Sequence, residues 1–369
     1  MAEFRLRAME DGDWPALSAF ARTHFGPSHL PERDFNEHWF GPVRHGRWIA
    51  RVLQADDGRI AGFMLSILVQ AKFGDTTAPL AWISNAAVEP EAKQKGAGAQ
   101  FYLWIYKSFP LVGAMSGNEE SLPINSVLGL DIPNVRMKRF IALHSRRAAE
   151  LCLPEFRHRV LAHSFETGAE CDSSCSGRWV AGIPEDYDAL WQSARERVFC
   201  TTERDRSHMT WRYEKAPYVA YMFLEVRFGP SLKALAVVRV QETSVGRVAR
   251  IVDFVSTPEA DRQAWLTVAY HTRRLDAVLT DFMVLGSIYD SALADSGWHP
   301  ADENTGLDAI PHLLSPVEHR QWTNTFHLGG ALARSTSAWR QANAVYFTKG
   351  DSDRDWPTTY DLRQSQVAI

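Results

Sequence analysis

The same order of predicted strands and helices occurs twice along this chain of 369 residues, and this repeat limits the fold more than any other feature. In each half a helix precedes three strands, and a second helix and a fourth strand follow them. The three strands are expected to be antiparallel, because short turns such as Asp56-Asp57-Gly58 join neighbouring apolar runs. Little residue identity relates the halves, so the repeat is one of architecture. We expect an α/β chain with two units in tandem, each a mixed, mostly antiparallel sheet flanked by helices.

Apolar spacing places these elements along the chain. In the first half, strands are predicted at residues 4–7, 48–54, 60–71, 80–88 and 111–115, and helices from residue 13 and over 98–108. In the second half, strands are predicted at residues 179–181, 218–227, 232–240, 249–255 and 277–285, and helices over 184–198, 258–275 and 289–296.

The texture of the chain changes between Leu151 and Gly177, where three of the four cysteines and a polar run occur. A length of 369 residues suits two domains at roughly 150 residues each. We therefore expect domains over residues 1–150 and 178–369, joined by a linker over 151–177.

Composition limits the partners, metal sites and cellular location that we expect for this chain. A net charge of −4 gives no basic excess to follow a phosphate backbone, so nucleic acid is disfavoured as a partner. Four cysteines do not make a disulfide framework, and no metal site is predicted, because Cys171 and Cys175 lack two further ligands at suitable spacing. The N-terminus lacks the apolar core of a signal peptide, and no apolar run approaches the ~20 residues of a membrane span. We expect a cytoplasmic protein.

The segment that carries chemistry leads from the strand at 82–88 through a loop with Gly96 and Gly98 into a helix. Such a turn aims backbone N–H groups at one point, and the helix N-terminus adds partial positive charge, so the point favours phosphate. Lys93 and Lys95 add positive charge at the rim.

Other interpretations of the two glycines stay open. A dinucleotide-binding turn would need a third glycine, and a nucleoside-triphosphate loop would need Gly-Lys followed by Ser or Thr; neither is present. A helix entry that needs only a flexible turn would also contain such glycines.

Lys93-x-x-Gly96-x-Gly98, between a strand and a helix, resembles the acyl-CoA-binding motif of the GNAT acyltransferases. That motif reads Gln or Arg, two residues, Gly, one residue, and Gly or Ala, so Lys93 departs from it at the first position. Asn118, Asn125 and Leu128-Gly129-Leu130 resemble the segment after the next strand, with Leu130 in place of the usual Phe. The resemblance covers about residues 4 to 145.

The resemblance implies acetyl-CoA or another short acyl-CoA as cofactor. In that family the strand before the loop splays from its neighbour, and its backbone binds the pantetheine arm and polarises the thioester carbonyl. By position this role falls to Ala86, Ala87 and Val88. The remaining cofactor-binding residues implied are Lys93, Gln94, Lys95, Gly96, Ala97, Gly98, Ala99 and Asn125.

The second half resembles a degenerate copy of the same fold. No glycine pair follows its strand at 251–255, and Glu259 and Asp261 open the next helix. Negative charge there repels phosphate, so we expect this copy to hold the acceptor instead. Two-lobed bacterial acyltransferases that act on nucleotide-linked amino sugars look like this. The stretch at 346–355 is similar to endings of proteins from polysaccharide-biosynthesis clusters.

Three residues are candidates for catalysis. Asp253 lies in an apolar strand, where a carboxylate is functional or paired, and Arg250 or Arg239 would be the ion-pair partner. His208 belongs to a polar and aromatic cluster that could grip an anionic acceptor, although an ordinary helix end with a packed Trp211 fits the same residues.

The third candidate, Asn118, follows the short strand beside the expected thioester. It could orient substrate or water, and capping of the loop is an equal alternative. A general base is not required of such an enzyme, because positioning alone can supply much of the rate.

The leading hypothesis is an acyl-CoA-dependent N-acyltransferase that moves a short acyl group to the amine of a small polar acceptor, most plausibly a nucleotide-linked amino sugar. One alternative is a non-catalytic acyl-CoA-binding or scaffold protein of a polysaccharide-biosynthesis system. Another is an aminoacyl transferase to a peptidoglycan precursor, which the charge balance and the absence of a long inserted coiled coil disfavour. A homo-oligomer stays open.

Overall fold

The computed structural model describes residues 3–25, 33–115, 136–165, 175–314, 317–318, 325–352 and 355. The chain divides into two compact units, and the division is not a single cut. The first unit comprises residues 1–133, 325–339 and 352–369, and the second comprises 134–324 and 340–351.

The first unit contains a mixed sheet in the order β1-β2-β3-β4-β5-β16. Neighbours are antiparallel except β4 and β5, which are parallel. Its strands are β1 (Phe4–Ala8), β2 (Ala50–Ala55), β3 (Ile60–Phe73), β4 (Thr76–Val88), β5 (Leu111–Met115) and β16 (Phe326–Gly329). Its helices are α1 (Trp14–Phe25), α2 (Arg33–Phe40), α3 (Pro42–His45), α4 (Pro90–Gln94), α5 (Ala99–Ser108) and α12 (Ala331–Arg334).

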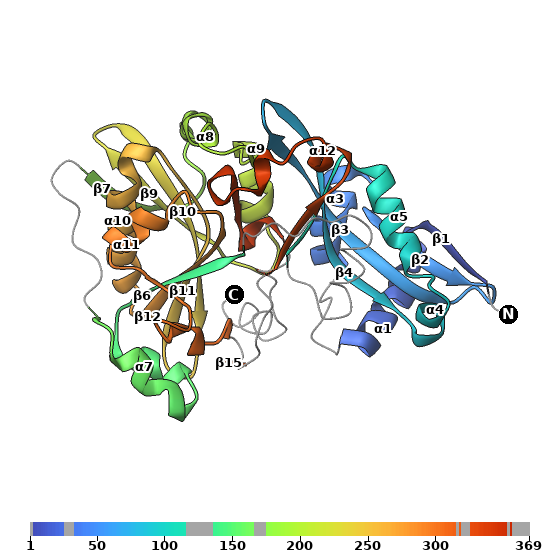
Figure 1. The fold of residues 1–369 in the computed structure, drawn as a ribbon, viewed down its shortest axis with the longest axis horizontal. Coiled ribbons are helices and arrows are strands. Elements are labelled where there is room, and N and C mark those ends of the chain that lie inside the picture. Colours follow the sequence, from blue (N-terminus) through green and yellow to red (C-terminus); the bar gives the residue numbers. More distant parts are fainter. Residues whose placement is uncertain are drawn as a thin grey trace. The chain divides into compact units, whose positions relative to one another are not determined.

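Alternation along β3 sends its side chains to two helical layers. Met64 belongs to a core shared with Phe101 and Ile105 of α5, so α5 covers one face (Figure 1). Phe63, the neighbouring residue, packs edge-on against Phe20 of α1, with ring centroids 6.0 Å apart. The sheet is therefore buried on both faces, which matches its apolar strands.

The second unit repeats this order. β9, β10 and β11 are successive antiparallel neighbours, β11 and β12 are parallel, and β7 lies at the edge beside β9. Its strands are β6 (Lys138–Leu143), β7 (Cys175–Val180), β8 (Cys200–Thr202), β9 (Met222–Phe228), β10 (Ser231–Glu242), β11 (Arg247–Ser256), β12 (Ala277–Leu285), β13 (His299–Pro300), β14 (Leu313–Leu314), β15 (Val317–Glu318) and β17 (Val345–Thr348).

Helices cover both faces of this sheet as well (Figure 1). Trp265 of α10 and Leu293 of α11 pack on one face, and Leu190 and Trp191 of α8 pack on the other. The helices are α7 (Arg157–Leu161), α8 (Tyr187–Arg195), α9 (Arg206–Met209), a π-helix η4 (Thr210–Glu214), α10 (Asp261–Arg273) and α11 (Asp290–Asp295). Short 3-10 turns add η2 (Arg146–Leu151), η3 (Pro154–Phe156), η5 (Pro258–Ala260) and η9 (Lys349–Asp351). The predicted fold class, two α/β units of mixed sheet flanked by helices, is confirmed.

Three strands lie far in sequence from the strands they pair with. β6 is antiparallel to β12 in the second unit, although the expected boundary at residue 150 assigns it to the first domain. β17 pairs with the end of β12, and β16 returns to β5 of the first unit. Residues 151–165 of the expected linker belong to the second unit, and 166–174 lie outside the described residues.

Candidate functional site

The strands β4 and β5 run side by side over only part of β4. Their pairing begins at Leu80 and ends where Ile83 lies opposite Ala114, and no described residue of β5 pairs with residues 84–88. On its other edge β4 stays paired with β3 to Val88, which lies opposite Gly62. Residues 84–88 of β4 are therefore paired with β3 on one edge, and no described residue of β5 lies along their other edge.

A β-bulge marks the place where the two strands part. The register between β3 and β4 shifts between Met64 and Ser66, so two β4 residues face a single residue of β3. Bulges turn a strand and are common beside functional sites. Ala86, Ala87 and Val88, the residues predicted to meet the acyl thioester, follow this bulge, and Gly62 permits the close approach, because a Cβ there would lie 2.9 Å from the carbonyl oxygen of Ala87.

The loop after β4 brings a helix N-terminus to the end of that strand. Gly96 has a φ of +69°, which favours glycine, and α5 begins directly after Gly98. A Cβ at Gly98 would lie 3.3 Å from Cγ2 of Val88, so loop and strand end are in contact. Ala97 is buried in the core beneath them and anchors the loop.

Among the described residues, the N–H of Gly98 in this loop has no acceptor. The N–H groups of Ala99, Gln100 and Phe101 donate to carbonyls three residues earlier, at 3.1–3.2 Å. No described residue accepts from the N–H of Gly98. No side chain in the described part of the chain caps this helix either, so its N-terminal partial charge is not neutralised by a cap.

The side chains around the glycine loop after β4 carry both signs of charge and are not purely basic. Nζ of Lys95 lies 2.9 Å from Glu91, and this hydrogen bond lowers the pKa of the Glu91 carboxyl. Lys93 is exposed. Arg59 forms an ion pair with Glu89 and lies 3.8 Å from Glu91. Attraction for phosphate would therefore come mainly from backbone dipoles at short range.

The second unit has a comparable separation between β11 and β12. Their pairing ends where Ile251 lies opposite Phe282, and a register shift in β10 and β11 again marks a bulge. Here buried side chains fill the region. The hydroxyl of Tyr346 donates to the carbonyl of Phe254, and the N–H of Ser256 donates to the hydroxyl of Tyr289.

Asp253, a predicted catalytic residue, lies inside this filled region and is fully buried. Both of its carboxylate oxygens are 3.0 Å from Nε of Arg204, and one accepts from the hydroxyl of Tyr213 at 2.9 Å. Arg204 also donates to Asp351. Burial opposes its charge, yet the two carboxylates hold the pKa of Arg204 well above its ordinary value.

The ion-pair partner expected for Asp253 was wrong. Arg250 instead pairs with Asp281 across β11 and β12, at 3.0 and 3.1 Å. In the register of the parallel pair, Arg250 lies directly opposite Asp281 of β12, which takes up its guanidinium. Arg204, on the segment after β8, reaches Asp253 from 49 residues away.

Acidic side chains occupy the entry to α10. Asp261 accepts from Arg197 at 2.5 Å and from the hydroxyl of Ser256 at 2.5 Å, and burial raises the pKa of its carboxyl. Glu259 pairs with Lys233 at 2.7 Å, which lowers the pKa of Glu259 to about 2. This helix entry is already supplied with anions from the chain itself.

The other predicted residues fall in two groups. His208 is buried, and its ring packs edge-on against Trp211 with centroids 5.6 Å apart, which is the packed helix end given as its alternative. Asn118 and Asn125 lie outside the described residues, as does the Leu128-Gly129-Leu130 segment.

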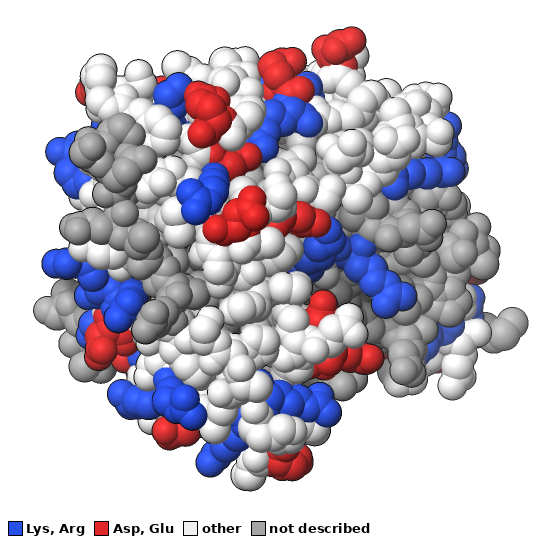
Figure 2. Space-filling model, turned by 60° about the vertical axis from the view of Figure 1, so that its left-hand side comes forward, with Lys and Arg blue, Asp and Glu red and all other residues white. Residues whose placement is uncertain are grey.

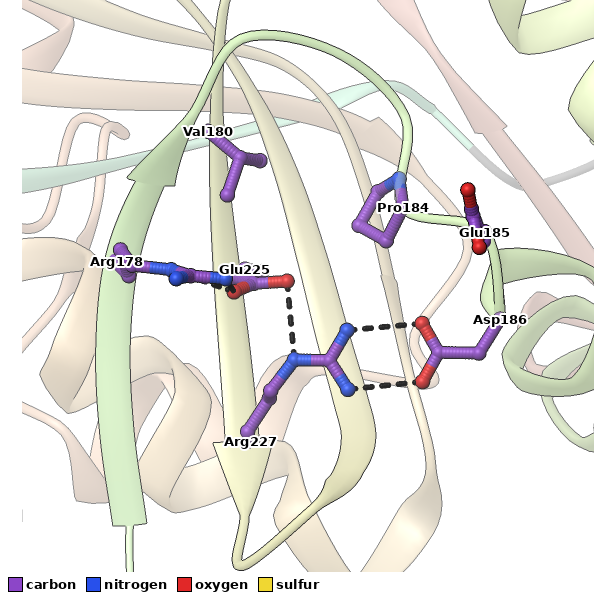
Figure 3. A pocket seen from close by; sticks show the side chains of 7 residues that line it. All are labelled: Arg178, Val180, Pro184, Glu185, Asp186, Glu225 and Arg227. Carbon is purple, nitrogen blue, oxygen red and sulfur yellow. Dashed lines mark hydrogen bonds and ion pairs between the residues drawn. The ribbon is translucent and has the colours of Figure 1, made fainter.

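Two hollows lie on the edge strands of the second unit. The first, of about 410 Å³, is lined by a chain of charges in which Glu225 accepts from Arg178 and Arg227, and Arg227 binds Asp186 through two bonds of 2.8 Å (Figure 3). These charges satisfy one another. The second hollow, of about 530 Å³, has three aromatic residues and the carboxylate of Glu214 in its lining. Sequence reasoning missed both, because their walls come from separate strands and loops.

Two further observations concern the surface and possible metals. On the face drawn in Figure 2, acidic and basic side chains are interspersed. In the described parts of the chain, no group of three His, Cys, Asp or Glu side chains is arranged to hold a metal ion, and no helix is long and apolar enough to cross a membrane.

No family model matches the chain, and no curated protein matches it in sequence. Its fold does resemble solved structures. A GCN5-related N-acetyltransferase from Anabaena variabilis aligns with a TM-score of 0.59 at 12% identity, over 88% of this chain and 72% of that one. A probable N-acyltransferase from Enterococcus faecalis gives 0.59 at 9%, over 90% and 73%, and a GCN5-related N-acetyltransferase from Kribbella flavida gives 0.51 at 13%, over 89% and 71%. The chain thus has the fold of GCN5-related N-acetyltransferases, as the glycine motif predicted.

Proposed function

We propose that the protein is an acyl-CoA-dependent N-acyltransferase whose cofactor binds the first unit. The observation that carries the proposal is the end of β4, beyond the last residue that β5 pairs with, in contact with a glycine loop whose Gly98 N–H donates to no described residue. The loop and the start of α5, residues 94–99, would bind the pyrophosphate. The fold neighbours named as N-acetyltransferases support the same class of reaction.

The chemistry needs little from side chains. The lone pair of the acceptor amine attacks the thioester carbonyl, a C–N bond forms, and the C–S bond breaks as CoA leaves. The amine proton passes to water or to the departing thiolate. Negative charge gathers on the carbonyl oxygen during attack, and a fixed N–H from residues 86–88 would stabilise it.

Isothermal titration with acetyl-CoA and with CoA tests the cofactor site. Gly98→Trp should abolish measurable binding, because the indole would cover the loop where strand and helix meet. Gly12→Trp is the matched control: nothing lies within 4 Å of a Cβ at Gly12, so binding should be retained. Wild-type protein that binds neither ligand, or a Gly98→Trp variant that binds as well as wild type, would contradict the proposal.

The acceptor is proposed to be a small polar amine of the nucleotide-linked amino-sugar class, held with the help of the second unit. The acidic entry to α10 supports this division, because that unit's own carboxylates occupy the place a second CoA would need. An assay of free thiol release against amino sugars, nucleotide-linked amino sugars, simple amines and peptides identifies the class. CoA binding without turnover on any amine would favour a binding or scaffold protein instead.

Asp253 and His208 are proposed to act in this enzyme as positioning and packing residues rather than as bases. Asp253 accepts hydrogen bonds from Arg204, from Tyr213 and from the N–H of Phe254. Both of its carboxylate oxygens are therefore occupied and are not available to take a proton from a substrate. Asn118 stays a predicted contact of the acceptor or of a water molecule.

A further inference from the structure

The aromatic hollow of the second unit has the features of a ligand site. It is formed by the start of the loop after β7, by the π-helix η4, and by the segment that leads into β9 together with the start of that strand. Its lining residues are Ala181, Gly182, Tyr213, Glu214, Val219, Ala220, Tyr221 and Phe223. A volume of about 530 Å³ is within the range of small-molecule pockets.

The backbone around this hollow is unusual in two independent places. Two lining residues, Tyr213 and Glu214, belong to the π-helix, a form that is rare and frequent at functional sites. Tyr218, in the segment that leads to β9, has a φ of +64°, which bulky residues seldom adopt. Strained backbone of this kind is retained where surrounding structure holds a functional geometry.

A single carboxylate lies in the hollow, and the chain positions it. One oxygen of Glu214 accepts from the N–H of Ile183. A Cβ at Gly182 would lie 2.6 Å from the same oxygen, so glycine is required for the carboxylate to rest there. No described residue donates a hydrogen bond to the other oxygen of Glu214, and the lining contains no lysine or arginine.

Aromatic rings complete the surroundings. The rings of Tyr213 and Tyr221 meet at 82° with centroids 5.1 Å apart, and Phe223 lines the wall beside them. Tyr213 cannot turn freely, because its hydroxyl donates to the buried Asp253 at 2.9 Å. Ring faces carry negative electrostatic potential, and together with a carboxylate they attract organic cations.

We propose that this hollow binds an organic ammonium ion that carries an apolar or aromatic body. The carboxylate of Glu214 would pair with the ammonium group, and the part-exposed ring of Tyr221 would cover the apolar body. An anionic ligand would meet Glu214 with no compensating cation in the lining. The site lies wholly in the second unit and needs no acyl-CoA, so it stands or falls separately from the cofactor site.

Benzylammonium and benzyl alcohol are suitable probes, because they share size and ring and differ in charge at pH 7. Titration of the full chain, without CoA, should show benzylammonium binding about fivefold more tightly, the factor given by an exposed ion pair of about 1 kcal/mol. Glu214→Gln keeps an acceptor for the Ile183 N–H and removes the charge. It should remove that preference and leave benzyl alcohol binding unchanged. Glu303→Gln, at an exposed acid elsewhere in the unit, should preserve the preference.

A second variant tests the rings. Tyr221→Phe should bind benzylammonium as wild type does, whereas Tyr221→Leu should weaken it severalfold, provided that both variants unfold at the wild-type temperature. The proposal is overturned if neither probe binds, if the two bind equally to wild type, or if Glu214→Gln keeps the preference for the cation. A loss shared equally by Glu303→Gln would mean a general charge effect and would also overturn it.

Discussion

The two units share one strand order, and in each of them two parallel strands separate. The units differ in what lies beside that separation. In each, a strand parts from its parallel neighbour at a bulge, in β4 in the first unit and in β11 in the second. The first unit leaves that edge beside a glycine loop. The second fills it with Arg204, Asp253 and Asp351.

This difference shows that two separating strands need new partners for the backbone groups that they no longer pair. Backbone groups exposed by the separation must find partners in side chains, in a ligand or in water. Where the chain supplies tyrosines and a buried ion network, the position becomes core. Where it supplies alanines and glycines, the position suits a molecule with its own hydrogen-bonding arm, such as pantetheine.

The largest effect is expected from breaking the network of the second unit. Arg204→Met would leave Asp253 and Asp351 buried without their cation. We expect a loss of about 3–5 kcal/mol, or a Tm roughly 6–20 °C lower. Thermal unfolding followed by circular dichroism measures this. Arg274→Met, at an exposed arginine, serves as control and should change Tm by less than about 1 °C.

A Tm of Arg204→Met close to that of wild type would contradict the view that this gap is filled core. Acetyl-CoA titration of the same variant, below its unfolding temperature, sharpens the comparison. Binding should be retained, since the cofactor is assigned to the first unit.

An intermediate effect is expected from giving the first unit the acidic helix entry of the second. Ala99 is exposed at the first position of α5, and Ala99→Glu should weaken CoA binding about tenfold through repulsion of the phosphates. Its Tm should stay the same or rise slightly. Ala99→Gln, of equal size, should bind within about twofold of wild type. Equal affinities of the Glu and Gln variants for CoA at low salt would argue against a phosphate at this helix.

The smallest effect concerns Glu259, whose pKa of about 2 lies below the ordinary value of 4.5 because of its hydrogen bond to Lys233. A carboxyl with a lowered folded-state pKa stabilises the protein above pH 4.5 and loses this contribution as the pH falls toward 2. Glu259 is largely exposed, so the contribution should not exceed about 1 kcal/mol. Urea unfolding of Glu259→Gln should show this deficit at pH 7 and a smaller one at pH 3. A deficit that is constant with pH would mean that the ion pair is not its cause.

Much of the fold could be predicted because the local pattern of apolar residues and breaks determines where most strands and helices begin and end. The predicted bounds of β5 and β12 agree with the structure, since each is an apolar run between clear breaks. β6, β16 and β17 were not in the predicted pattern. Each is short, and each pairs with a strand at least 60 residues distant, a choice that no local periodicity encodes. The amphipathic spacing of Phe35 and Trp39 could have revealed α2.

The residues of the candidate site also fall into those that the local sequence could identify and those that it could not. Gly96 and Gly98 were identifiable because a positive φ and a close approach leave a glycine signature in the sequence. The role of Asp253 was not, because Arg204 and Asp351 reach it from 49 and 98 residues away along the chain. Glu214 was missed because its only marker is Gly182, which lies 32 residues earlier and looks like an ordinary turn glycine.

During synthesis on the ribosome, β5 appears more than two hundred residues before β16, the strand that covers its outer edge. At 5–20 residues per second this edge waits roughly 10–40 seconds for its partner. An uncovered strand edge can recruit other chains, so the nascent protein is exposed to misassembly for that interval. A messenger truncated before the codon for Phe326 would make that exposure permanent.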